Sequence, residues 1–217
     1  MDLKHATPPS TPLAHGAILQ LNGLQFRFET RTLFDRLTLA FDAGITWLRG
    51  ANGAGKTTLL KLAGGALSPH GGTIHIDTLD SAGQSLAYRL QCFYCGGESP
   101  QLPWLTVQEW LDLHLALYPA TDVATLNQHL TAFGLLTTLS QAITTLSLGQ
   151  HKKLQLALAL TLPVRVLLID EPFNGLDTDA LAYLRLQLAA PERLRSQCIV
   201  LTSHLEPVLP LVRTLQL

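Results

Sequence analysis

Two hydrophobic patterns predict the strands of this chain. Apolar residues nearly alternate over residues 18–28 and again over 37–41, as in strands with one buried face. A short strand at 73–76 follows a loop that contains glycine and proline. Two runs, 164–169, which is apolar apart from Arg165, and 198–202, are typical of parallel strands that are buried on both faces. We expect the first three strands to form an antiparallel sheet beside a mainly parallel core.

Helical patterns dominate residues 106–162. A capping box, Thr106 with Glu109, opens the first helix, because each side chain can bond the backbone N–H of the other residue. The limits expected for the next two helices are Asp122 and Gly134, then Ser147 and Pro163. Strands and helices in this order predict an α/β protein, and 217 residues suffice for one such domain.

A glycine-rich loop carries the most specific chemistry. Residues 50–57 match G-x-x-x-x-G-K-[ST] between an apolar stretch and a helix-like run. Backbone N–H groups of such a loop form an anion nest at the positive end of a helix. Lys56 would neutralise the β and γ phosphates of a nucleotide, and the Thr57 hydroxyl would coordinate Mg²⁺. The alternative, a glycine-rich turn before any helix, is outweighed by the complete match. The residues expected to contact nucleotide here are Asn52, Gly53, Ala54, Gly55, Lys56, Thr57 and Thr58.

A second acidic element follows the buried strand at 164–169. Asp170 and Glu171 end this strand, and the carboxyl ends of strands face the nucleotide in a phosphate-loop sheet. Asp170 is then expected to hold Mg²⁺, and Glu171 to polarise an attacking water molecule. The alternative is an exposed acidic turn without chemistry.

Composition narrows the possible partners. Hydrophobic residues make up 47% of the chain and charged residues 14%, with a formal net charge of -1. Without a basic field, nucleic acid is not an expected partner. The mean hydropathy of +0.23 suggests that another protein covers some apolar surface.

Residues 1–15 are expected to be a disordered, proline-rich tail, and the longest apolar stretch, 156–169, is too short to span a bilayer. Any transmembrane partner is then a separate chain.

The three cysteines fit a reducing compartment better than a disulfide framework. Cys92 and Cys95 form a C-x-x-C pair in a strand-like segment, where residues i and i+3 point to opposite faces. We therefore expect buried thiols and no shared metal. Seven histidines have no evident chemistry and are expected at the surface: His5, His15, His70, His75, His114, His129 and His151.

Several short motifs in order give the chain a family resemblance. Residues 146–150, Leu-Ser-Leu-Gly-Gln, resemble the signature L-S-G-G-Q, and residues 174–177 resemble a D-loop. His204 stands where the family has its switch histidine, and Phe28 where an aromatic ring stacks on adenine. From about residue 18 to its end, the chain resembles the nucleotide-binding subunit of an ATP-binding-cassette (ABC) transporter.

The resemblance implies a fold and a mechanism. The fold is a P-loop NTPase with a mainly parallel core sheet, an antiparallel β subdomain and a helical subdomain at about 98–162, within a single domain at 16–217. It implies two copies that clasp two ATP molecules, with the phosphate loop of one copy facing the signature of the other. The residues that it adds to the nucleotide site are Phe28, Ser147, Gly149, Gln150 and Asp177, and His204 joins Glu171 and Lys56 in catalysis. It further implies a separate integral-membrane subunit and a cytoplasmic location on the inner face of the membrane.

Two departures from the family pattern affect different steps. Leu148 replaces the first glycine of the signature pair, but the serine hydroxyl and Gly149 remain, so function is expected to be retained. Gly97 falls where the family has its Q-loop glutamine, which touches Mg²⁺ and relays nucleotide state to the membrane subunit. Either Glu98 or Gln101 takes over this role or a relaxed loop suffices, so the departure bears on coupling to the membrane subunit and not on ATP binding.

Three functional hypotheses follow. The first is an ATPase that drives a separate membrane protein, and export is the favoured direction of transport. Residues 31–34 and 48–56 also resemble the ATP-binding subunit of the cytochrome c maturation exporter. The second is a non-transport ABC ATPase that acts on a soluble assembly partner. The third, a GTPase or small-molecule kinase, lacks an N-K-x-D motif and leaves the signature without a purpose.

Overall fold

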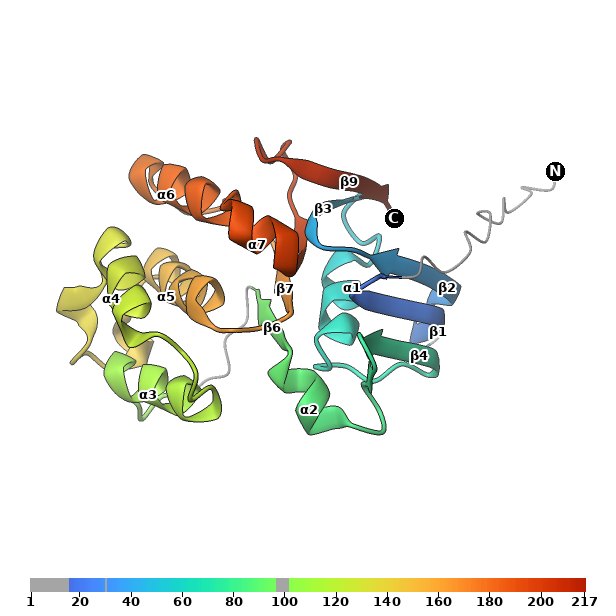
Figure 1. The fold of residues 1–217 in the computed structure, drawn as a ribbon, viewed down its shortest axis with the longest axis horizontal. Helices are drawn as coiled ribbons and strands as arrows, with labels where there is room; N and C mark the ends of the chain where they lie inside the picture. Colours follow the sequence, from blue (N-terminus) through green and yellow to red (C-terminus); the bar gives the residue numbers. More distant parts are fainter. Residues whose placement is uncertain (1–15, 30, 97–101) are drawn as a thin grey trace.

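The computed structural model describes residues 16–29, 31–96 and 102–217. An antiparallel sheet forms one side of the molecule (Figure 1). Its strand order is β2-β1-β4-β5, and β1 pairs antiparallel with both of its neighbours. The bounds of its strands are β1 (Leu19–Phe28), β2 (Arg31–Phe41), β4 (Gly71–Ile76) and β5 (Leu79–Asp80). The expected antiparallel strands therefore exist, although β2 begins six residues earlier than its hydrophobic alternation indicated.

A parallel sheet forms the centre of the fold. Its strand order is β6-β7-β8-β3-β9, and every neighbouring pair is parallel. The bounds are β3 (Gly44–Arg49), β6 (Cys92–Cys95), β7 (Val166–Ile169), β8 (Cys198–Thr202) and β9 (Leu211–Gln216). Because β7, β8 and β3 are neighbours, their carboxyl ends bring the acidic turn, the histidine and the glycine-rich loop to one edge.

Helices cover both faces of this sheet. Their bounds are α1 (Lys56–Ala63), α2 (Ser85–Leu90), α3 (Val107–Leu117), α4 (Val123–Ala132), α5 (Leu148–Thr161), α6 (Thr178–Leu188) and α7 (Pro191–Ser196). Short 3₁₀ turns occur at Leu136–Thr138 and Ile143–Thr145. The predicted caps are present: Thr106 and Ser147 form capping boxes, and Asp122 accepts a hydrogen bond from the N–H of Ala124.

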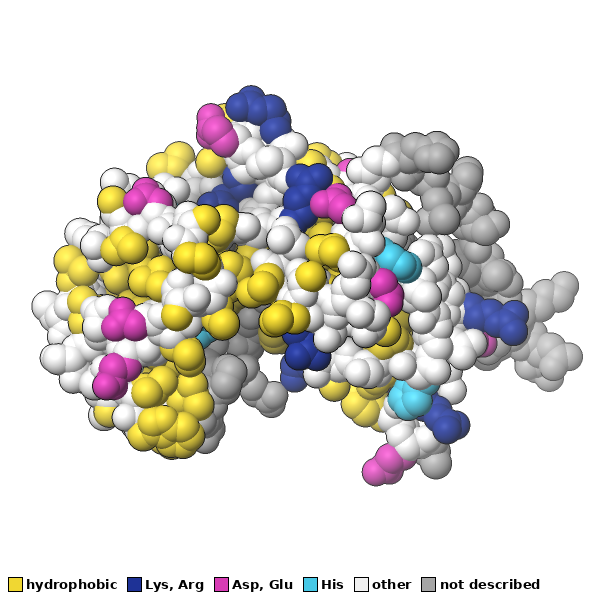
Figure 2. Space-filling view, turned by 60° about the horizontal axis from the view of Figure 1, so that its bottom comes forward, with side chains coloured by type: hydrophobic (Ala, Val, Ile, Leu, Met, Phe, Trp, Pro, Cys, Tyr) yellow, Lys and Arg dark blue, Asp and Glu magenta, His cyan; other side chains and the backbone are white. Residues whose placement is uncertain are grey.

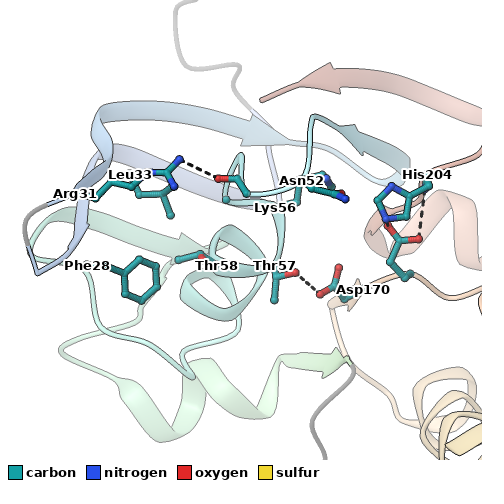
Figure 3. Close-up of a pocket in the computed structure, with 12 residues that line it drawn as sticks. Phe28, Arg31, Leu33, Asn52, Lys56, Thr57, Thr58, Asp170 and His204 are labelled. Atoms are coloured by element: carbon teal, nitrogen blue, oxygen red, sulfur yellow. Dashed lines mark hydrogen bonds and ion pairs between the residues drawn. The ribbon is translucent and has the colours of Figure 1, made fainter.

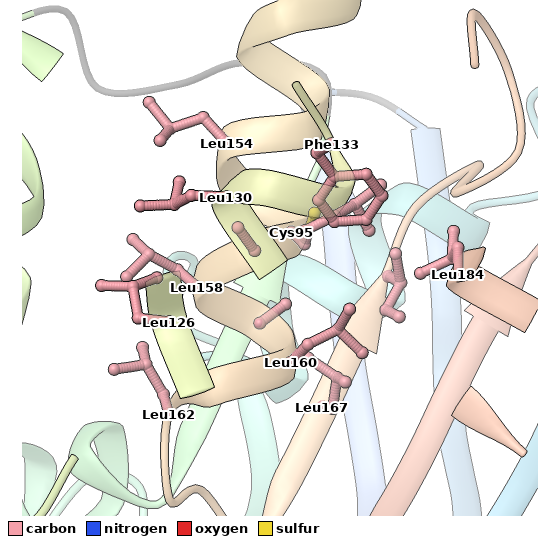
Figure 4. Packing of buried hydrophobic residues seen from close by; sticks show 14 of the residues in the cluster. Cys95, Leu126, Leu130, Phe133, Leu154, Leu158, Leu160, Leu162, Leu167 and Leu184 are labelled. Atoms are coloured by element: carbon pink, nitrogen blue, oxygen red, sulfur yellow. The ribbon is translucent and has the colours of Figure 1, made fainter. Parts of the chain in front are cut away.

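Two hydrophobic cores lie on opposite faces of the parallel sheet. One joins the sheet to α1 and the antiparallel strands, and it includes Leu60 and Cys92. The other joins the sheet to α3, α4, α5 and α6, and it includes Leu158 and Cys95 (Figure 4). A fully buried leucine contributes roughly 2 kcal/mol through the hydrophobic effect, so α5, with Leu154, Leu156, Leu158 and Leu160 buried, is anchored firmly.

The two cysteines of the C-x-x-C pair lie as expected. They begin and end β6, both are buried, and each belongs to a different core. Burial raises the pKa of Cys92, and it raises the pKa of Cys95 to about 12. Neither thiol is therefore ionised at neutral pH.

The structure corrects the expectation that His129 is a surface residue. Its side chain is 3% exposed, and its Nδ1 lies 2.7 Å from the hydroxyl of Tyr183. Leu126, Leu130 and Phe133 pack on the same face of α4, at the spacing of a buried helical stripe. That spacing is the signal that would have placed His129 inside.

Three sequence predictions remain without a structural answer. The tail at 1–15 lies outside the described residues, as does Gly97 with its possible substitutes. The boundaries of a helical subdomain at 98 and 162 stay a prediction. In the described part of the chain, no helix combines the length and apolar character that crossing a bilayer requires.

Candidate functional site

The glycine-rich loop links β3 to α1 in the geometry that its sequence predicts. β3 ends at Arg49 and α1 begins at Lys56, with Gly53 and Gly55 at φ 78° and 102°. A Cβ on Gly55 would lie 2.9 Å from Cζ of Phe34. Only glycine meets both demands, because the conformation is left-handed and the space is occupied.

Lys56 closes the mouth of this loop. Its side chain is 8% exposed, and its ammonium donates hydrogen bonds to the carbonyls of Gly50 at 2.7 Å and Ala51 at 3.1 Å. The two carbonyls carry no formal charge, so they stabilise the positive charge of the Lys56 ammonium only through their dipoles. A phosphate in the loop would offer this ammonium a full negative partner.

A chain of hydrogen bonds joins the loop to the acidic strand end. The Thr57 hydroxyl donates to Oδ2 of Asp170 at 2.5 Å, and the Thr202 hydroxyl donates to Oδ1 at 2.6 Å. Both carboxylate oxygens are thereby oriented from neighbouring elements. Thr202 was not foreseen from sequence, although it directly precedes the Ser-His pair at the end of β8.

Glu171 and His204 lie together at the next position along the same edge. The N–H of His204 lies 3.3 Å from Oε2 of Glu171, and Nε2 of the ring lies 3.5 Å from Oε1. The side-chain amide of Asn174 reaches the same Oε2 at 3.3 Å. Two donors therefore hold the carboxylate, while His204 remains exposed to an incoming ligand.

These groups line one cavity of about 450 Å³ (Figure 3). Its lining residues are Phe28, Arg31, Leu33, Asn52, Gly53, Gly55, Lys56, Thr57, Thr58, Asp170, Glu171 and His204. The structure thus brings together the phosphate loop, the acidic pair, the histidine and the aromatic residue that sequence singled out. Ala54 belongs to the same loop but does not line the cavity.

Two further lining residues come from the start of β2. Arg31 donates from Nη2 to the carbonyl of Gly53 at 3.3 Å, and Leu33 packs on Gly55. Phe28 is 52% exposed, with its ring edge-on to Phe26 at 4.9 Å. An exposed ring at the cavity rim is available for stacking on a base.

The oxygen atoms of Thr57 and Asp170 suit a magnesium ion as ligands. Thr57 and Asp170 present a hydroxyl and a carboxylate side by side at the phosphate loop. Mg²⁺ prefers hard oxygen ligands and is usually held by one or two protein groups together with substrate phosphates. These two residues therefore fit the group that sequence implied.

The signature residues lie away from this cavity, at the start of α5. Ser147 and Gln150 hold each other in the capping box, and Leu148 between them is 90% exposed. A Cβ on Gly149 would lie 3.2 Å from the carbonyl of Gly175, so glycine allows close packing there. Within one copy, the structure does not bring these residues to the phosphate loop.

Asp177 caps the following helix, α6. It accepts a hydrogen bond from the N–H of Ala180 at 2.9 Å and forms an ion pair with Lys153 of α5. The hydrogen bond from Lys153, followed by that from Ala180, lowers the pKa of Asp177. The segment between Asp170 and Asp177 is consequently tied to α5.

A phosphate loop facing an acidic strand end defines a P-loop nucleoside triphosphatase. Within that class, the sequence profile of the ABC transporter family matches residues 34–174, more than half of the chain. The chain therefore belongs to the ABC transporter family as an ATP-binding subunit, and it is an ABC-type ATPase.

Similar proteins agree with this assignment. The cytochrome c biogenesis ATP-binding export protein CcmA of Colwellia psychrerythraea is 33% identical over 178 residues, which cover 81% of this chain and 80% of the relative. CcmA of Rickettsia bellii is 30% identical, over 92% of this chain and 100% of the relative. The solved structure of an ATP-binding subunit of an ABC transporter aligns with a TM-score of 0.79 and 28% identity, over 87% of this chain and 80% of that one.

Proposed function

We propose that this chain hydrolyses ATP to drive a separate integral-membrane subunit, in export that serves cytochrome c biogenesis. The observation that carries the proposal is the Glu171–His204 pair beside the phosphate loop in one cavity. The similarity to CcmA proteins supports the export and biogenesis parts. The subunit would work on the cytoplasmic face of the membrane, where ATP is made available.

The phosphate loop would bind the triphosphate first. Backbone N–H groups around Gly53 and Gly55 would receive its oxygens, and Lys56 would exchange its two carbonyl partners for phosphate. Thr57 and Asp170 would hold Mg²⁺, which supplies charge neutralisation on the phosphates when bound. Phe28 would stack on the adenine ring.

Glu171 would then act on the attacking water. A carboxylate beside the γ phosphate can orient water and accept its proton, and His204 would keep water and phosphate in line. The contacts from Asn174 and from the N–H of His204 fix the carboxylate before any ligand arrives. Such preorganisation lowers the reorganisation needed at the moment of reaction.

Enclosing the bound ATP would require a second copy of the chain. Ser147, Gly149 and Gln150 surround the exposed start of α5, where the N–H groups of the first turn that the capping box does not use would form an anion site. The γ phosphate held by one copy would meet this site on its partner, so ATP would favour the closed homodimer by mass action. Hydrolysis would remove the bridging charge and open it.

Exposed apolar side chains support a membrane partner. Figure 2 shows hydrophobic side chains gathered over the part of the molecule that contains α3 and α4. Trp104, Leu113 and Leu117 near or on α3 are all exposed. Exposed apolar side chains that gather on one part of a surface are typical of a site that another protein covers, which supports a partner here.

The variant Glu171→Gln tests the catalytic part of this proposal. It should bind ATP, lose turnover, and form a dimer with MgATP in light scattering, because only the proton-accepting group is lost. The matched control is Glu206→Gln, an exposed carboxylate outside the cavity, which should keep the parent rate. Turnover of Glu171→Gln at the parent rate would remove Glu171 as the base.

Purification from membranes tests the partner. The tagged full chain should co-purify with an integral-membrane protein whose retention depends on the exposed residues Trp104 and Leu113. Double substitution of these two residues to Ser should release that protein while ATP binding persists. Co-purification with a soluble assembly protein alone would favour the non-transport alternative.

A further inference from the structure

The backbone of Glu171 is held from both of its sides. Its N–H donates to the hydroxyl of Thr202 at 2.9 Å, and its carbonyl accepts a hydrogen bond from the ammonium of Lys152. The same ammonium lies 3.4 Å from the carbonyl of Asp170. Thr202 belongs to β8 and Lys152 to α5, so two separate elements fix this one residue.

Glu171 has a conformation that needs such support. Its φ is 50°, in the left-handed region, although it is not glycine. A side chain in this region costs roughly 1–2 kcal/mol and persists only where surrounding contacts over-determine it. The contacts from Thr202 and Lys152 act on the peptide groups that set this conformation, whereas His204 and Asn174 act on the carboxylate.

Lys152 is placed for this contact by the helix that carries it. Its side chain is half-buried, and desolvation lowers its pKa, opposed by the nearby Cys95, Asp170 and Glu171. A desolvated ammonium must find acceptors, and the two carbonyls of the acidic turn supply them. The neighbouring residue on α5, Lys153, pairs with Asp177 at the other end of the same segment.

We propose that Lys152 is a positioning residue for ATP hydrolysis, which fixes the backbone of Glu171 and ties it to the helix that begins at the signature. The proposal rests on the function proposed above for Glu171. Lys152 lies little more than one helical turn from Ser147, and a helix moves as a rigid element. A shift of α5 upon contact with the nucleotide of a second copy therefore reaches the carboxylate of its own copy.

Steady-state kinetics of the full chain with MgATP test this role. Lys152→Met keeps the length of the stem and removes the ammonium. We expect kcat to fall by about tenfold to a hundredfold, as for a misplaced catalytic group. KM and the Kd for ATP should stay at the parent values, because Lys152 does not line the cavity. Lys152→Arg, which keeps a charged donor, should recover most of kcat.

Controls separate positioning from a general loss of structure. Arg195→Met removes an exposed cation from α7 and should leave kcat unchanged. Thermal unfolding monitors the fold, and Lys152→Gln replaces the Met variant in the same comparison if the Met variant does not fold. Any of three results overturns the proposal. The Lys152→Met variant could keep the parent kcat, it could change KM instead of kcat, or the Lys152→Arg variant could fail to recover kcat.

A parallel measurement on Glu171→Gln keeps this outcome distinct from the function itself. If Glu171→Gln stops turnover while Lys152→Met keeps the parent kcat, only the positioning role is wrong. If Glu171→Gln turns over ATP at the parent rate, the proposed role of Glu171 is wrong, and the role of Lys152 with it.

Discussion

The hydroxyl of Thr202 lies 2.6 Å from Oδ1 of Asp170 and donates a hydrogen bond to it. The hydroxyl oxygen of Thr202 in turn accepts a hydrogen bond from the N–H of Glu171 at 2.9 Å. One buried hydroxyl on β8 therefore orients the carboxylate expected to hold the metal and the backbone of the residue expected to polarise water. The two acidic residues therefore share one neighbour, in addition to the contacts that each makes separately.

Replacing Thr202 with Val should lower both stability and turnover. The isosteric valine leaves the partly buried N–H of Glu171 without this partner, which costs about 1–3 kcal/mol in the free energy of unfolding. Urea unfolding measures this loss, and ATPase assays should show a fall in kcat. Thr202→Ser retains the hydroxyl and serves as the matched control. Equal unfolding midpoints for the Val and Ser variants would contradict the bridging role.

Replacing Lys56 with Ala should weaken ATP binding by several kcal/mol, about 3–5 by analogy with a buried ion pair that loses one partner. Lys56 is the cation that lies across the loop mouth in the cavity. Calorimetric titration with MgATP gives the change in Kd. Arg195→Ala, far from the cavity, controls for the loss of one positive charge. An unchanged affinity for ATP would show that the loop alone holds the phosphates.

Replacing Gly55 with Ala should disrupt the phosphate loop. The new methyl group would meet Phe34 at 2.9 Å, and φ of 102° is unfavourable for alanine. We expect ATP affinity to fall strongly, with a smaller loss of about 1–3 kcal/mol in stability from strain. Gly53→Ala is a graded control, because its Cβ would meet open space at φ of 78°. Equal ATP affinity in the two variants would argue against close packing at Gly55.

The stability of the protein should depend on pH through His129. Burial, followed by the charge of Arg193, lowers the pKa of His129 below 6.5. At pH values well above 6.5, His129 is neutral in both the folded and the unfolded state. Its titration then takes nothing from the free energy of unfolding. Below 6.5 the unfolded state binds a proton first, so stability falls as pH drops towards the folded pKa.

Urea unfolding at pH values on either side of 6.5 tests this dependence. The variant His129→Gln, whose amide can still bond Tyr183, should lose less stability on acidification than the parent. His114, whose pKa is also lowered by desolvation, is present in both proteins and cancels in the comparison. Parallel pH curves for parent and variant would show that His129 does not titrate on unfolding.

Much of the fold was readable because local chemistry determines it. The capping boxes at Thr106 and Ser147 and the cap at Asp122 begin helices where the sequence indicated. The buried strand β8 has the predicted bounds, since continuous apolar residues suit a strand covered on both faces. The strand β9 was missed because its residues are mostly exposed and follow two prolines.

The site was readable only in part, for a different reason. Lys56, Asp170 and Glu171 belong to motifs whose residues are close in sequence, so spacing alone predicted that they lie in one site. Thr202 and Lys152 make their contacts with residues that lie 18 to 32 positions away. Such contacts arise from strand order and helix packing, which one sequence does not display.

The burial of the native thiols has a practical consequence for spectroscopy. Cys92, Cys95 and Cys198 are all buried, and burial raises the pKa of each, so maleimide reagents should leave them unmodified in the folded protein. A single cysteine introduced at Leu186 of α6, whose side chain is 69% exposed and lies outside the signature and the cavity, can then carry a spin label. Pulsed resonance between two labelled copies would report their separation with and without nucleotide, in a chain that keeps every one of its own sulfurs.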